Sequence, residues 1–70
     1  MSAAPIVVHR PSPSGGRAVT INGELAGLAH DDSDLVEFLR RAGLYDCEQI
    51  LDDPVWTEWR GGLAHRYEAT

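Results

Sequence analysis

Apolar side chains recur every three to four residues between Asp31 and Leu44, a spacing that predicts an amphipathic helix over about residues 31–43. Gly43 suits the left-handed position after the last turn, where Leu44 can pack back as in a Schellman motif. The residues of the apolar stripe are Leu35, Phe38, Leu39 and Ala42, with Val36 at its edge. We expect this stripe to be the buried face of the helix.

Acidic residues cluster at the start of the predicted helix. Asp31 can accept a backbone N–H as the N-cap, and Asp34 lies where its carboxylate can reach back as in a capping box. Asp32 and Ser33 are alternative caps. These carboxylates favour the positive end of the helix dipole, so the cluster indicates capping rather than a metal site.

The chain before the helix has the composition of strands. Residues 5–10, 17–21 and 24–29 are rich in β-branched and apolar side chains and predict three strands. Asn22-Gly23 favours a type I′ turn, because that turn needs positive φ at both positions. The second and third strands should therefore form a hairpin.

A two-residue turn fixes the register of this hairpin. The expected pairs are Ile21 with Glu24, Thr20 with Leu25, and Val19 with Ala26. In this register one face carries Val19, Ile21, Ala26 and Leu28. We expect the helix to cover that face.

A second, shorter helix is predicted after the first. Asp46 and Gln49 have the spacing of a capping box, which predicts a helical turn over residues 47–51. That turn would bury Ile50 and Leu51. The sequence Asp52-Asp53-Pro54 then ends it.

The tail over residues 55–68 allows two interpretations. In the first, strands 55–60 and 63–68 form a hairpin around Gly61-Gly62, so that Trp56 pairs with Tyr67. In the second, Asp53 caps a short helix that begins at Pro54 and ends at Gly61. The hairpin is favoured, because β-branched and aromatic residues alternate with polar ones.

The whole chain of 70 residues is predicted to be one small domain. Its expected fold is α+β: a small antiparallel sheet of three to five strands with one main helix on one face and a short helical turn. Residues 1–4 are expected to be disordered. Residues 11–16, PSPSGG, are expected to form a flexible loop.

The charge balance restricts the possible partners. The net charge is −5, and all six basic residues are arginine. An acidic protein is poorly suited to nonspecific nucleic-acid binding, which needs a basic face. The N-terminus lacks the pattern of a secretory signal and the chain has no transmembrane run, so a cytoplasmic protein that does not enter a membrane is expected.

Few residues suggest chemistry. The potential ligands His9, His30, His65 and Cys47 are scattered and lack metal-site spacing, so neither a metal nor another cofactor is expected. Nothing places Cys47 beside a histidine, and a lone cysteine is commonly a small buried hydrophobe. We therefore predict no catalytic residues and no enzymatic activity.

The residues that the predicted fold leaves unexplained are aromatic and lie in the tail. Tryptophan, tyrosine and arginine are enriched in binding hot spots. They predict an interaction patch formed by Trp56, Trp59, Arg60, Arg66 and Tyr67. The structural alternative is that the tryptophans complete the core.

The predicted function is accordingly a cytoplasmic protein–protein interaction or regulatory module, which binds an unknown protein or a second copy of itself. One alternative is a nucleic-acid-associated regulator that uses Arg60, Arg66 and the tail aromatics. Another is a small-ligand binder or enzyme with its pocket near Cys47.

Two segments carry a resemblance to other sequences. EFLRRAGL (residues 37–44) and EWRGG (residues 58–62), preceded by a strand–Asn-Gly–strand unit, resemble small acidic proteins of unknown function from GC-rich bacteria. The resemblance implies a small fold and a regulatory or interaction role. It implies no site residues.

Overall fold

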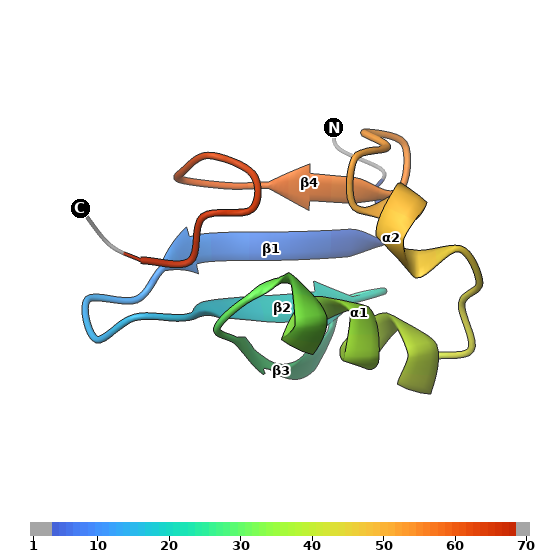
Figure 1. The fold of residues 1–70 in the computed structure, drawn as a ribbon, viewed down its shortest axis with the longest axis horizontal. Coiled ribbons are helices and arrows are strands. Elements are labelled where there is room, and N and C mark those ends of the chain that lie inside the picture. Colours follow the sequence, from blue (N-terminus) through green and yellow to red (C-terminus); the bar gives the residue numbers. More distant parts are fainter. Residues whose placement is uncertain (1–3, 69–70) are drawn as a thin grey trace.

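The computed structural model describes residues 4–68, which form a four-stranded sheet and two helices (Figure 1). The elements along the chain are β1 (Ile6–Pro11), β2 (Arg17–Ile21), β3 (Glu24–Ala29), α1 (Asp32–Arg41), α2 (Cys47–Ile50) and β4 (Thr57–Trp59). The predicted α+β fold, with one main helix and a short helical turn, is confirmed. Disorder was predicted for residues 1–4, of which residues 1–3 lie outside the described residues.

The sheet is mixed, whereas an antiparallel sheet was predicted. Its order is β3-β2-β1-β4, and β4 runs parallel to β1 with Ile6 opposite Thr57 and Val8 opposite Trp59. A parallel neighbour requires a crossover connection. Here α1 and α2 supply that crossover, so the chain returns to β1 in the same direction instead of reversing (Figure 1).

The hairpin of β2 and β3 has the predicted turn, with Asn22 at φ 53° and Gly23 at φ 84°. The pairs of Ile21 with Glu24 and of Thr20 with Leu25 are confirmed.

Beyond these two pairs the predicted register is wrong. Val19 lies opposite Gly27, because a bulge leaves Ala26 without a partner. Ala26 and Leu28 are exposed instead of facing the helix, and Gly27 and Ala29 take the inner positions. The bulge shifts the alternation of β3 by one residue.

Phe38 of α1 packs directly on the backbone of Gly27. A Cβ atom at Gly27 would lie 2.7 Å from Cζ of Phe38, and φ of Gly27 is 155°. Gly27→Ala should therefore lower the free energy of unfolding by about 1–3 kcal/mol, through overpacking and backbone strain. Urea unfolding measures this cost. Phe38→Leu shortens the opposing side chain, so the variant with both substitutions should lose less free energy of unfolding than the sum of the two single losses. Strictly additive losses would contradict the contact.

Both ends of α1 are specified by local contacts. The Asp31 carboxylate accepts a hydrogen bond from the backbone N–H of Asp34 at 2.9 Å, which confirms Asp31 as the N-cap. The Asp34 carboxylate accepts from the N–H of His30 at 3.0 Å, one residue before the position that a capping box would use. At the other end, N–H groups of Gly43 and Leu44 donate to carbonyls of the last turn, as predicted for a Schellman motif.

The start of α2 differs from its prediction. Asp46 makes no side-chain cap and has left-handed backbone angles (φ 54°, ψ 42°), whereas an N-cap residue is normally extended. The predicted burial of Ile50 and Leu51 is confirmed.

The tail combines parts of both interpretations. The carbonyl of Asp53 accepts from the N–H groups of Trp56 and Thr57, so a single turn begins at Asp53. The strand β4 then covers three residues, and no second strand follows among residues 60–68. The predicted hairpin is wrong: the tail turns onto the sheet because buried side chains bind it there.

The core lies between one face of the sheet and the helices and tail that cover it. It consists of Ile6, Val8, Val19, Ala29, Leu35, Leu39, Cys47, Ile50, Leu51 and Tyr67. Side chains of the opposite face, such as Leu25, stay exposed. None of the helices within residues 4–68 is long and apolar enough to cross a membrane.

Candidate functional site

The first residue of β2, Arg17, lies inside the protein. Strand alternation places it on the same face as Val19, and its side chain is fully buried. Its guanidinium donates to backbone carbonyls of Val8 (3.5 Å), His9 (2.7 Å), Arg60 (2.6 Å), Leu63 (2.9 Å) and Arg66 (2.8 Å). The guanidinium therefore joins β1 to the tail.

No carboxylate binds this guanidinium among the described residues. The ring of Trp59 lies 5.3 Å from its central carbon, which is cation–π distance. Burial lowers the pKa of Arg17 from its usual value, but an arginine keeps its charge at neutral pH. Carbonyl dipoles and one aromatic face thus replace an anionic partner.

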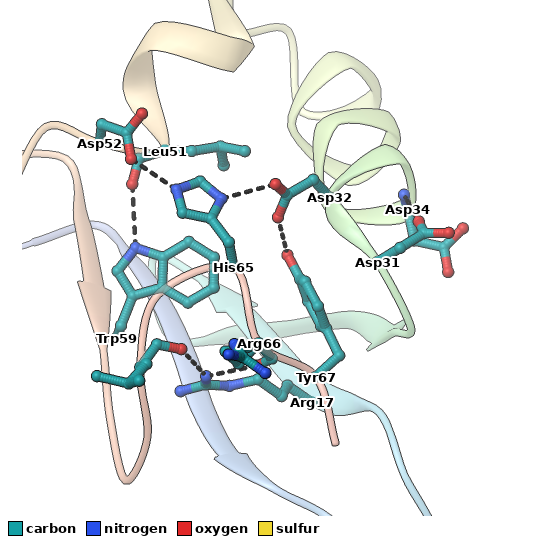
Figure 2. A network of polar contacts seen from close by, with 11 residues as sticks. Arg17, Asp31, Asp32, Asp34, Leu51, Asp52, Trp59, His65, Arg66 and Tyr67 are labelled. Carbon is teal, nitrogen blue, oxygen red and sulfur yellow. Dashed lines mark hydrogen bonds and ion pairs between the residues drawn. The ribbon is translucent and has the colours of Figure 1, made fainter.

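A histidine of the tail lies between two carboxylates (Figure 2). Nδ1 of His65 is 2.6 Å from Oδ2 of Asp32, and Nε2 is 2.6 Å from Oδ1 of Asp52. Asp32 begins α1, and Asp52 follows α2. Hydrogen bonds with Asp52 and Asp32 raise the pKa of His65.

Tyr67 binds the same α1 carboxylate from the other side. Its hydroxyl donates to Oδ1 of Asp32 at 2.6 Å, and its side chain is 7% exposed. Burial and the Asp32 carboxylate raise the pKa of the Tyr67 hydroxyl, so the phenol is neutral at ordinary pH. We call the contacts of His65 and Tyr67 with Asp32 and Asp52 the rim network.

Trp59 connects this rim network to Arg17. Its indole N–H donates to the carbonyl of Leu51 at 3.0 Å, and its ring lies 5.1 Å from that of His65 and 6.1 Å from that of Tyr67. The tail is therefore fixed from inside by Arg17 and at the rim by His65 and Tyr67.

The docked tail forms one wall of a groove in the described surface. This groove has a volume of about 730 Å³ and lies between residues 61–68 and the ends of β1 and β3. Side chains that line it include Arg10, His30, Asp31, Leu63, Arg66 and Glu68.

The charges in this groove are not all neutralised. Arg10 and Arg66 form no ion pair with any residue from 4 to 68, and both are exposed. The Asp31 carboxylate already accepts a cap hydrogen bond. Leu63 is 73% exposed and adds an apolar surface. The groove can thus offer two arginines and a leucine to a ligand.

The five residues predicted as an interaction patch are distributed over different surroundings. Trp59 and Tyr67 pack against each other, with Tyr67 buried. Arg66 and Tyr67 line the groove, while Arg60 forms an ion pair with Glu58. Trp56 is 39% exposed and follows the turn at Asp53.

The residues that sequence reasoning missed are Arg17, Asp32 and His65. For Arg17 a signal existed, because it alternates with Val19 and Ile21 on the inner face of β2. For His65 there was none, since its two partners are 33 and 13 residues away along the chain.

Cys47 is buried, and its thiol donates to the carbonyl of Leu44 at 3.3 Å. It does not line the groove. Within residues 4–68, no three histidine, cysteine or acidic side chains are arranged to hold a metal ion.

Neither models of known families, nor curated proteins, nor solved structures match this chain.

Proposed function

We propose that this protein is a small cytoplasmic interaction module without catalytic activity of its own, and that its groove receives an extended acidic segment of a partner protein. The observation that carries the proposal is the pair of arginines, Arg10 and Arg66, which line the groove without an ion pair to residues 4–68.

Arginine chemistry favours an acidic partner. A guanidinium binds a carboxylate through two parallel hydrogen bonds, which gives both attraction and orientation. Gly61 and Gly62 also line the groove; a Cβ atom would meet Arg10 at Gly61 and Pro11 at Gly62, so these glycines bring the tail backbone close to the end of β1, where Arg10 lies. Leu63 supplies the apolar contact that interfaces usually include.

Some charges in the groove oppose this partner and restrict its position. Glu68 and Asp31 also line the groove, so an acidic segment must avoid them. A segment that lies along Arg10 and Arg66 with its carboxylates, and turns neutral groups toward Asp31, satisfies both conditions. The net charge of −5 further disfavours partners that are acidic throughout.

The contacts of His65 and Cys47 support a binding role. Both ring nitrogens of His65 are engaged by carboxylates, so neither is a free base. The Cys47 thiol is buried and donates to the carbonyl of Leu44, so its sulfur is not presented at the surface.

A peptide titration tests the proposal. The probe is the capped peptide Gly-Asp-Glu-Leu-Asp-Gly, followed by amide chemical shifts of the labelled protein. We expect shifts at Gly61, Gly62 and Arg66. Arg10→Gln and Arg66→Gln should each weaken binding roughly fivefold, because each removes a charge-assisted hydrogen bond worth about 1 kcal/mol at an exposed site.

Arg40→Gln is the matched control, since Arg40 is an exposed arginine of α1 outside the groove. It changes the net charge equally and should leave affinity unchanged. A second control peptide carries Asn and Gln in place of Asp and Glu. Equal binding of both peptides, or shifts that map outside the groove, would contradict the proposal. Tighter binding of a single-stranded oligonucleotide would replace it with the nucleic-acid alternative.

A further inference from the structure

The docked tail is fixed by two sets of contacts that respond differently to pH. Arg17 binds carbonyls of Arg60, Leu63 and Arg66 from inside, and a guanidinium keeps its proton at any ordinary pH. The rim network includes His65, and imidazole is the side chain whose unperturbed pKa lies nearest to neutral pH. Only the second set can change between pH 6 and pH 9.

The geometry around His65 requires the imidazolium form. A neutral imidazole carries one N–H, so it can donate to only one of two acceptors. Both nitrogens of His65 face carboxylate oxygens at 2.6 Å. When the ring is neutral, one nitrogen lone pair would point at a negatively charged oxygen, and that contact becomes repulsive.

The other groups around His65 reinforce this dependence. Asp32 approaches from α1, Asp52 from the residues after α2, and the Trp59 ring from β4. Tyr67 donates to the second oxygen of Asp32 and so does not compete with His65 for the first. The one cation that faces this cluster from β2 is Arg17, which lies against the Trp59 ring.

We propose that His65 is a proton-operated clamp, which holds residues 64–68 against α1 and the loop after α2 when protonated and loosens them when it loses its proton. Because these residues form a wall of the groove, the clamp would also control access to it. That second consequence rests on the proposed function, whereas the clamp itself does not.

The direction of the pH effect follows from linkage. Its partners raise the pKa of His65 above the value of about 6.5 that an unfolded chain has. The stabilisation that His65 gives through Asp32 and Asp52 is therefore fully present below about pH 6.5. It is lost as the pH rises through the higher folded-state pKa of His65. The tail should be tightest in mildly acidic solution and looser in mildly alkaline solution.

NMR on the full chain between pH 6 and pH 9 tests the clamp without any ligand. We expect the ring signals of His65 to titrate above the value of about 6.5 that an unperturbed imidazole has. Two amides report the tail, because the N–H of Gly16 donates to the carbonyl of Tyr67 and the N–H of Arg66 donates to the carbonyl of Leu63. Their exchange, corrected for its intrinsic pH dependence, should become faster across the same range. The expected increase is about tenfold for each pH unit by which the folded-state pKa exceeds that of the loosened form.

Two variants distinguish the clamp from a general loss of stability. His65 has φ 66°, a conformation that asparagine tolerates well, so His65→Asn removes the clamp without straining the backbone. This variant should show fast exchange at Gly16 and Arg66 at every pH. His9→Gln is the control, because His9 lies on β1 outside the groove and its ring contacts Thr20 instead of the rim network. Its pH dependence should match that of the unaltered protein. A pKa of His65 that does not exceed about 6.5, or corrected exchange at Gly16 and Arg66 that does not vary with pH, would overturn the clamp.

Peptide affinity then separates the two proposals. Both proposals are supported if His65 titrates as expected and the unaltered protein binds the acidic peptide more weakly at pH 8.5 than at pH 6.5. The His65→Asn variant should lack this difference in affinity. If exchange follows His65 while no peptide binds at any pH, the clamp stands and the proposed function fails.

Discussion

Replacing Arg17 with methionine should lower the free energy of unfolding by about 3–5 kcal/mol, the largest loss that we expect from a single substitution here. Methionine fills similar space but leaves buried carbonyl oxygens without donors. Those oxygens belong to β1 and to the tail, so both would lose their connection. The free energy of unfolding of a domain of this size is small, so such a loss is a large fraction of it. Urea unfolding followed by tryptophan fluorescence measures the loss.

Arg17→Lys separates charge from geometry. Lysine keeps the positive charge but has one ammonium group, which cannot reach carbonyls on both sides at once. We expect it to recover only part of the loss, leaving about 2 kcal/mol. Arg40→Ala, at an exposed position of α1, should change stability by no more than about 0.5 kcal/mol. An Arg17→Met variant as stable as the Arg40→Ala control would contradict the role assigned to Arg17.

Tyr67→Ala is expected to have the second largest effect, with a loss of about 3 kcal/mol in the free energy of unfolding. The ring is buried against Trp59, and its hydroxyl donates to Asp32, so truncation removes both the packing and the rim contact. The loss is at the lower end of the range for aromatic residues, because a tail residue can detach without unfolding the sheet. Urea unfolding measures the loss for the whole domain. Amide exchange at Gly16, whose N–H donates to the carbonyl of Tyr67, reports detachment of the tail and should change more.

Tyr67→Phe keeps the ring and removes only the hydroxyl. It should cost about 1–2 kcal/mol, which is the range for a hydrogen bond to a charged group that partly rehydrates. Tyr45 is 86% exposed, so Tyr45→Ala is the matched control and should be nearly neutral. If Tyr67→Phe and Tyr67→Ala lost the same amount, the packing of the ring would contribute nothing and the assignment would be wrong.

These residues also show why the tail was difficult to predict. Aromatic alternation in residues 55–60 correctly indicated strand character for β4, because side-chain periodicity is a local property. The pairing partner was not local. Gly61-Gly62 fits a hairpin turn, yet the tail instead gives its carbonyls to Arg17, a residue more than 40 positions earlier. A distant donor outweighed the local turn preference.

Arg17 marks the part of the site that the sequence could have revealed. Its place in the alternation of β2 points it inward, which is unusual for an arginine and calls for buried acceptors. Nothing in the sequence says that these acceptors would be carbonyls of the tail. The residues of the rim network were not predicted, because the acidic start of α1 suggested capping alone. In the structure Asp31 provides the cap, and the Asp32 carboxylate binds His65 and Tyr67 instead.

The sequence by itself determined the elements whose signals are local. The limits of α1, the turn at Asn22-Gly23 and the glycine that ends α1 all depend on residues within a few positions of one another. Tertiary structure decided the parallel pairing of β4, the bulge in β3 and the place of the tail, because each depends on packing between distant segments. The groove and the His65 clamp belong to this second group: their residues become neighbours only when Arg17 and Tyr67 dock the tail on the sheet.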